Sequence, residues 1–298
     1  MKYGVMVYIL VLIVVILIVG IVIPAVKMHT MLDCRTSGEA YNPSEFGVES
    51  SIVNLKSADG LSIVAYEVDV DTPRGVIICL AGIHSKTVTN WYGHARLFAD
   101  NGYASILLDL RSHGQSEGER IYAGTREWMD VDAVVSYIKS NSKYTGVPIV
   151  VMGLSMGAAT ALVSIGRNSN IDGVIALSAF SSWEYNFNRN VEQKVPMWVA
   201  KMLEPFVSVV TYMRFGRMMK ISPINQIANI GSRPALLIHS IGDRLVPFAN
   251  FEQLTTVAPQ VQTWVVEGDN HCIIDDFLRP QTDSLYCDKI IKFLTTNF

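Results

Sequence analysis

Short, continuous apolar runs alternate with segments of helical periodicity through most of the 298-residue chain. Apolar runs of this kind are typical of central parallel strands whose two faces are both covered. Helices between successive strands supply that cover, so the pattern predicts an α/β fold with a mostly parallel central sheet and helices on both faces. The expected strands are 51–56, 61–70, 76–81, 104–110, 148–152, 174–177, 235–239 and 263–266, and the expected helices are 91–100, 125–140, 156–165 and 284–296.

The N-terminal segment is apolar and uncharged from Val5 to Ile23. Roughly 20 apolar residues at about 1.5 Å per residue cover a hydrocarbon core of about 30 Å. A signal peptide has a shorter apolar region, about 7–15 residues, and a small-residue cleavage site. The residues that follow here, Pro24-Ala25-Val26, form a poor cleavage site. We therefore expect a single-pass transmembrane helix over residues 1–26, with a cleaved signal peptide as the alternative.

The orientation of this helix in the membrane is not decided by the positive-inside rule. Lys2 precedes the apolar stretch, and Lys27 and Arg35 follow it. A very short N-terminal tail is typical of retention in the cytoplasm, which favours an extracytoplasmic position for the rest of the chain.

Two further boundaries follow from composition. Residues 27–50 are polar and turn-rich and are expected to form a linker, with the main domain over 51–298. Between 181 and 230 there is no strand pattern, and about fifty residues are too many for an ordinary loop. We expect this stretch to form a small helical lid, in which Trp198 and Met202 would contact an apolar part of a ligand.

Charge and cysteine content exclude several classes of function. The formal net charge is −3 and charged residues make up 17% of the chain, so no basic surface for nucleic acid is expected. The four cysteines form no CxxC pair and no Cys/His cluster, which argues against a zinc site. No cofactor is indicated. Cys79 lies in an apolar run and is expected to be a buried core residue, while the sequence does not decide whether the other three cysteines form a disulfide.

The stretch 153–157, Gly-Leu-Ser-Met-Gly, lies between an expected strand and a helix rich in alanine. In that context a GxSxG sequence predicts a sharp turn that exposes the hydroxyl of Ser155, while the flanking glycines allow close packing. The N-terminus of the following helix favours developing negative charge. Ser155 is therefore the candidate nucleophile.

A serine nucleophile needs a base, and that base needs an acid to orient it. Two histidines follow Ser155: His239 lies at the end of a strand, where a packed role is expected, and His271 lies in a turn after the last strand. We predict His271 as the base. Among the acid candidates Asp243, Asp269, Asp275 and Asp276, we favour Asp243 because it directly follows a strand.

The negative oxygen formed during acyl transfer needs at least two hydrogen-bond donors. One is expected to be the backbone N–H of Met156, directly after the nucleophile. The other is expected from the loop after the strand at 76–81, where we choose the backbone N–H of Ile83. His84 is expected either to line the entrance to the site or to be an ordinary loop residue.

These motifs together resemble the α/β-hydrolase superfamily, in particular bacterial proteins related to serine aminopeptidases and monoacylglycerol lipases. The resemblance covers residues 50–298 and rests on AGIHS, LLDLRSHGQSEG, GLSMG, SPINQI, IGDRLVP and GDNH. It implies structural roles for Asp109 and His113. The family usually carries His-Gly where this chain has Ala81-Gly82, a departure that leaves the oxyanion amide available but does not fix the geometry of the loop.

The expected function is hydrolysis of a carboxylic ester through a Ser155 acyl-enzyme, with a lipophilic ester favoured by the apolar anchor and lid. A peptidase of the aminopeptidase type is the alternative, because one triad serves both chemistries. A non-catalytic, membrane-anchored binding protein is a third hypothesis. The expected partners are a small ester or short peptide and, through residues 5–23, a membrane.

Overall fold

The computed structural model describes residues 2–298 and contains an eight-stranded sheet in the order β1-β2-β4-β3-β5-β6-β7-β8. β1 and β2 pair antiparallel, β2 pairs antiparallel with β4, and the remaining pairs are parallel. The expected mostly parallel sheet is therefore confirmed. The strands are β1 Ser51–Lys56, β2 Ser62–Val68, β3 Val76–Leu80, β4 Ala104–Asp109, β5 Ile149–Leu154, β6 Gly173–Leu177, β7 Ala235–Ser240 and β8 Gln262–Val266.

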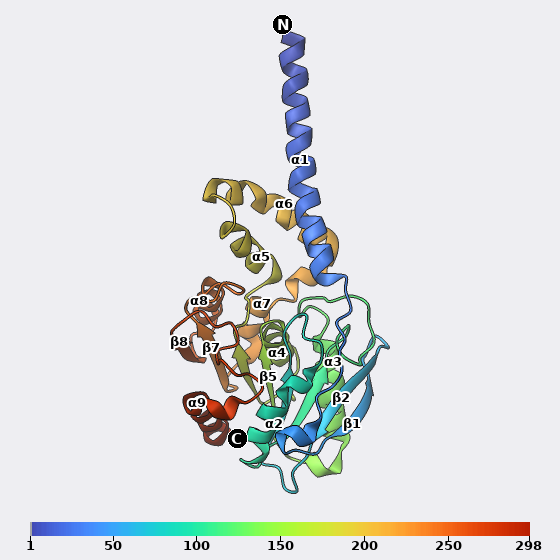
Figure 1. Ribbon diagram of the computed structural model, residues 1–298, viewed down its shortest axis with the longest axis vertical. Coiled ribbons are helices and arrows are strands. Elements are labelled where there is room, and N and C mark those ends of the chain that lie inside the picture. Colours follow the sequence, from blue (N-terminus) through green and yellow to red (C-terminus); the bar gives the residue numbers. More distant parts are fainter. Residues whose placement is uncertain (1) are drawn as a thin grey trace.

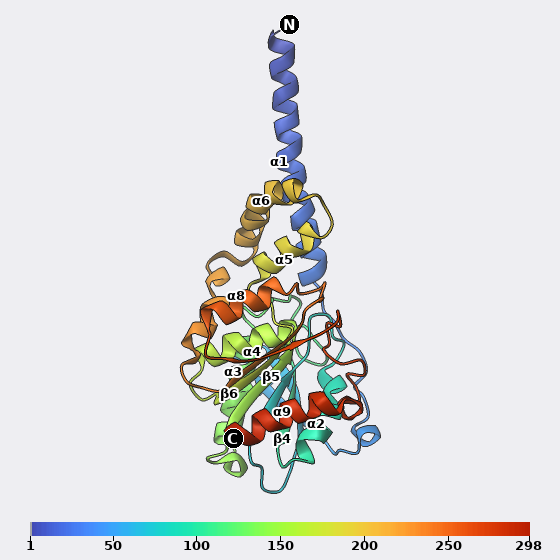
Figure 2. The same cartoon turned by 90° about the vertical axis from the view of Figure 1, so that its left-hand side faces the viewer.

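Helices cover both faces of this sheet (Figures 1 and 2). Side chains alternate along β3: Val76, Ile78 and Leu80 join the apolar cluster of one face, while Ile77 and Cys79 join that of the other. The first cluster includes residues of α3 Trp128–Ser140, α4 Met156–Arg167, α7 Pro223–Ile227 and α8 Ala249–Val257; the second includes residues of α2 Tyr92–Ala99 and α9 Ser284–Asn297. Full burial on both faces explains why these strands are continuously apolar.

The segment expected as a helical lid does fold as helices. It contains α5 Trp183–Glu192, α6 Met197–Phe215, a 3₁₀ turn at Gly216–Lys220 and α7, which packs against α4. Figure 1 shows α5 and α6 beyond the end of the sheet from which α1 also projects. The helix α8 was not expected from the sequence.

The N-terminal helix α1 runs from Lys2 to Leu32. Its described part from Val5 has a mean hydropathy of 3.5 over its most apolar window and is long enough to cross a membrane, a criterion that a signal sequence also meets. The helix continues through the first six residues of the expected linker because Met28 and Leu32 are fully buried in the apolar cluster that also contains α3 and α4.

The rest of the linker lies along the domain of residues 51–298 and is held by hydrogen bonds. Thr36 pairs with His113 in an isolated β-bridge, in which the Thr36 N–H donates to the Ser112 carbonyl at 2.8 Å. The Tyr41 N–H donates to the Thr89 hydroxyl at 2.9 Å. The helix α1 is therefore joined to the domain by a packed segment.

This packing predicts that the end of α1 contributes to the stability of the domain. Replacing the fully buried Met28 with Ala is expected to lower the free energy of unfolding by about 2–5 kcal/mol, the usual cost of such a cavity. Met6→Ala is the matched control, since Met6 is 61% exposed on the same helix. Thermal unfolding of the detergent-solubilised proteins measures both. Equal melting temperatures would mean that the end of α1 is not part of the folded core.

Candidate active site

Ser155 lies in a strained turn between β5 and α4. Its backbone has φ 57° and ψ −116°, a conformation that side-chain-bearing residues rarely adopt. The Ser155 N–H donates to the Leu177 carbonyl at the end of β6 at 2.8 Å, which fixes the turn against the neighbouring strand. The residue is 8% exposed. The turn thus has the sharp strand-to-helix geometry that the sequence predicts.

The two glycines of the motif are required by close backbone packing. A Cβ atom at Gly153 would lie 2.3 Å from the Gly157 carbonyl carbon, and one at Gly157 would lie 2.3 Å from the Leu80 oxygen. Neither neighbour is a flexible side chain, so a larger residue would push α4 away from β3 or β5. The glycines therefore bring the start of α4 against the end of β3, where the next loop begins.

Asp243 and His271 follow β7 and β8 and are joined by a hydrogen bond. Asp243 Oδ2 accepts from His271 Nδ1 at 2.7 Å. The parallel strands β5, β6, β7 and β8 are consecutive neighbours, so the residues that follow them meet at one edge of the sheet. The structure therefore brings the predicted acid and the predicted base together at the edge where Ser155 lies.

The carboxylate of Asp243 is held rigidly in a buried position. Its side chain is fully buried, and its Oδ1 accepts from the backbone N–H groups of Leu245 at 2.8 Å and Val246 at 3.0 Å. His239 lies 3.6 Å from Oδ2, but its Nε2 donates to the Val246 carbonyl at 2.7 Å. Burial lowers the pKa of His239 and favours its neutral form. Asp243 thus remains available to His271.

Ser178, which was not predicted from the sequence, holds the backbone at His271 in place. It directly follows β6 at φ 51°, is fully buried, and its hydroxyl donates to the His271 carbonyl at 2.8 Å. Within the described residues, Ser155 Oγ and His271 form no direct hydrogen bond, a common situation in enzymes without bound substrate. A small polar residue directly after a buried strand is the signal that could have identified Ser178.

The loop after β3 passes beside Ser155, as predicted. A Cβ atom at Gly82 would lie 3.4 Å from Ser155 Cβ, an ordinary contact distance. Ile83 is the next residue along this loop, and the N–H of Met156 belongs to the first turn of α4, where amides have no intrahelical acceptor. His84, at φ 63°, donates from Nε2 to the Met31 carbonyl of α1 at 2.8 Å. His84 therefore joins this loop to the end of α1.

Residues 71–222, about half of the chain, match the family described as serine aminopeptidase, S33. The chain belongs to this family. The uncharacterised protein YqkD of Bacillus subtilis strain 168 is 33% identical over 215 residues, which are 70% of this chain and 68% of that protein. The uncharacterised protein YfhR of Escherichia coli K12 is 23% identical over 260 residues, or 85% and 83% of the two chains.

Solved structures confirm the α/β-hydrolase fold of this family member. An esterase from Pyrococcus furiosus superposes with a TM-score of 0.69 at 22% identity, covering 89% of this chain and 98% of that one. An acylaminoacyl peptidase from Pyrococcus horikoshii gives a TM-score of 0.58 at 16% identity, over 83% of this chain and 41% of that one. At these identities the likeness concerns the fold alone.

The other acid candidates of this α/β hydrolase make different contacts. Asp269 is exposed. Asp275 accepts from the Asn270 side chain at 3.1 Å, and Asp276 accepts from the N–H groups of Leu278 and Arg279 at 3.1 Å each. Of the four candidates, Asp243 is the one whose carboxylate contacts His271.

Asp109 and His113 hold loops in place, in agreement with the structural roles implied by the resemblance. Asp109 accepts from the Val88 N–H at 2.8 Å and the Gln115 N–H at 2.9 Å, and burial raises its pKa. His113 Nδ1 donates to the Arg111 carbonyl at 2.9 Å, and burial lowers its pKa.

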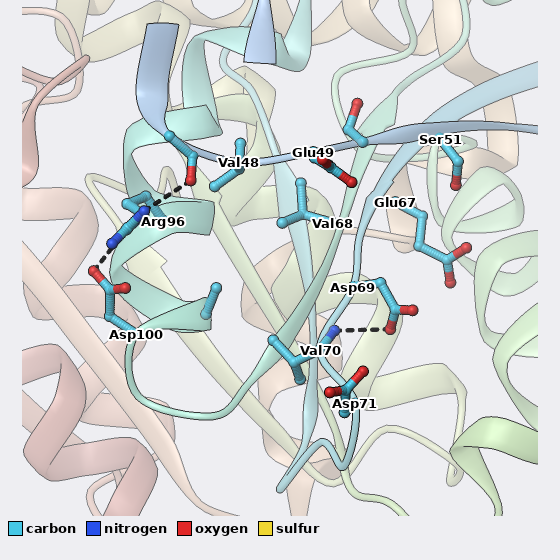
Figure 3. A pocket seen from close by; sticks show the side chains of 13 residues that line it. Val48, Glu49, Ser51, Glu67, Val68, Asp69, Val70, Asp71, Arg96 and Asp100 are labelled. Carbon is cyan, nitrogen blue, oxygen red and sulfur yellow. Dashed lines mark hydrogen bonds and ion pairs between the residues drawn. The ribbon is translucent and has the colours of Figure 1, made fainter. Parts of the chain in front are cut away.

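A separate open pocket of about 640 Å³ lies at β1, β2 and α2, away from this edge of the sheet (Figure 3). None of the candidate catalytic residues lines it. Its acidic side chains outnumber the single arginine, Arg96, whose guanidinium binds Asp100 at 2.8 Å. The acidic residues of its lining are Glu49, Glu67, Asp69, Asp71 and Asp100. An acidic surface of this kind is a poor place for an acyl chain.

Proposed function

We propose that this family member is a serine hydrolase that cleaves a carboxylic ester through an acyl-enzyme on Ser155. The observation that carries the proposal is the 2.7 Å hydrogen bond between Asp243 and His271, at the sheet edge where Ser155 is held in its strained turn. Nucleophile, acid and base then follow one another along the chain in the order typical of this fold.

The hydrogen-bond pattern at Asp243 determines which nitrogen of His271 serves as the base. An ionised carboxylate only accepts hydrogen bonds, so His271 Nδ1 carries the proton that Asp243 Oδ2 receives. Nε2 is then free to take the proton from Ser155 as its oxygen attacks the ester carbonyl. The imidazolium that results is stabilised by the buried carboxylate, and it later gives the proton to the leaving alcohol.

The charge on the tetrahedral oxygen would be stabilised by the backbone N–H groups of Met156 and Ile83. Met156 starts α4, so the helix N-terminus adds to the favourable potential. Collapse of the intermediate leaves the acyl group on Ser155 and releases the alcohol. Water, activated by the same His271 nitrogen, then attacks the acyl-enzyme and regenerates the serine. This sequence uses only side chains, backbone amides and water.

A peptidase acting on short substrates is the alternative, favoured by the description of the family that the chain matches. A panel of p-nitrophenyl esters and aminoacyl anilides distinguishes the two substrate classes. We expect kcat/KM to be higher for the esters, because an enzyme that α1 anchors in a membrane lies beside lipophilic ester substrates. Higher kcat/KM for the anilides would assign the enzyme to the peptidases.

We further propose that α1 anchors the hydrolase to a membrane by a single pass, with the catalytic domain on the extracytoplasmic side expected from the sequence. The uncharged, apolar stretch 5–23 supports the span. Resistance of the full chain to carbonate extraction tests the anchor, and protease accessibility in intact cells tests the side. A soluble, N-terminally shortened mature protein would instead identify α1 as a signal peptide.

A further inference from the structure

The helix α6 presents several large apolar side chains to solvent. Its exposed apolar side chains include Trp198 at 71%, Met213 at 74% and Tyr212 at 62% exposure. We call these residues, together with Met197, Met202 and Val209, the outer face of α6. The opposite side of the helix is buried through Ala200, Val207, Val210, Thr211 and Phe215. The outer face is thus an apolar surface that the fold itself leaves uncovered.

Contacts with α1 fix the position of α6 relative to the anchor. Gly20 lies against the Phe206 ring, so closely that a Cβ atom there would be 2.8 Å from it. Thr211 Oγ1 lies 3.8 Å from Met28 Sδ, and Arg214 binds the Asp33 carboxylate through both of its terminal nitrogens, at 3.0 Å and 2.5 Å. A series of contacts therefore holds α6 against the last third of α1.

This position places α6 at the boundary of the membrane. Gly20 is three residues from the end of the apolar stretch at Ile23, or about 5 Å along the helix. Figures 1 and 2 show α6 lying across α1, at the level where α1 emerges from the rest of the molecule. If α1 stands upright in a bilayer, α6 lies in the plane of the interface, where tryptophan and tyrosine side chains are enriched.

The charge of this segment is complementary to anionic lipid. Residues 193–220 contain five basic residues and one acidic residue, Glu204, in a chain whose net charge is −3. Of the basic residues, Arg214 is paired with Asp33; the others are Lys194, Lys201, Arg217 and Lys220. Basic side chains beside an apolar helix face are typical of helices that lie on anionic membrane surfaces.

We propose that the outer face of α6 is a second membrane contact, which lies in the headgroup region of an anionic bilayer beside the α1 span. The inference rests on the proposed membrane anchoring by α1. It gives Trp198 and Met202 a partner other than the substrate group expected from the sequence, since both side chains are exposed on this face. It also places the loops that carry Ser155 and His271 on the membrane side of the sheet, because the adjoining Ile83–His84 loop contacts α1.

The experiment measures quenching of tryptophan emission by lipid in the full-length protein. The chain is reconstituted in vesicles of phosphatidylcholine and phosphatidylglycerol whose acyl chains are brominated close to the headgroup. The α1 helix has no tryptophan, and Trp198 is one of five in the chain, so we expect a loss of about one fifth of the emission if all five emit equally. Trp198→Phe should abolish the loss, while the control Trp264→Phe, on β8, should retain it.

A charge-reversal pair tests the preference for anionic lipid. Lys201→Glu with Arg217→Glu is expected to reduce the quenching of Trp198. The matched control Lys56→Glu with Lys139→Glu changes the same charge on β1 and α3 and should leave it unchanged. Equal quenching in both double variants would overturn the role of anionic lipid.

Two further readings on the same samples separate this inference from the proposed function. Carbonate resistance reports the α1 anchor, and labelling by a fluorophosphonate reports Ser155. If the protein is resistant and labelled but wild type and Trp198→Phe are quenched equally, the contact by α6 is refuted while the anchor and the hydrolase remain. Equal quenching of the wild type and Trp198→Phe would also be seen if a second copy of the chain, in place of lipid, covered the outer face. Release by carbonate would refute the anchor itself.

Discussion

Replacing Ser155 with Ala is expected to abolish both ester hydrolysis and labelling by a fluorophosphonate, with a loss of about 10⁶ in kcat. The alanine keeps the backbone turn but removes the only atom that can carry the acyl group. Because the substitution removes a single oxygen from a small side chain, the fold should survive, which a melting curve checks. The rate of p-nitrophenyl ester hydrolysis measures the effect.

Ser136→Ala is the matched control for this variant, since Ser136 is an exposed serine on α3. It should retain full activity and full labelling. Complete residual labelling of Ser155→Ala would remove Ser155 from the mechanism. Absence of labelling in the wild-type protein would favour the third hypothesis, a membrane-anchored protein that binds without catalysing.

The fold class was predictable because the strands are buried on both faces, which leaves long apolar runs in the sequence. The Ser155 turn was predictable for a different reason, since the requirement for Gly153 and Gly157 is local and visible in five residues. Asp243 could be selected because a residue directly after a parallel strand must lie at the same sheet edge as Ser155. In each case a short segment already contains the physical constraint.

Other features depend on contacts between distant segments, which no local pattern records. The end of α1 belongs to the core through Met28 and Leu32, although the polar composition of 27–50 predicts a linker there. The helix α8 was missed because its sequence, Ala249–Val257, has weak amphipathic periodicity. The contact of Ser178 with His271 joins residues 93 positions apart. Such contacts require the assembled sheet.

Asp243→Asn should reduce kcat by about 10⁴, the usual loss when the base is held in the wrong tautomer. Three N–H donors point at the Asp243 carboxylate: the amides of Leu245 and Val246, and His271 Nδ1. The single oxygen of an asparagine would be taken by the two amides, so its NH₂ group would face His271 and require an unprotonated Nδ1. The proton would then move to Nε2, which could no longer accept the proton of Ser155.

Asp269→Asn is the control. This residue lies two positions before His271 and is exposed, so the activity of the variant should stay close to that of the wild type. Steady-state kinetics with one ester substrate compares the two variants, and a larger loss in Asp269→Asn would transfer the role of the acid to that residue.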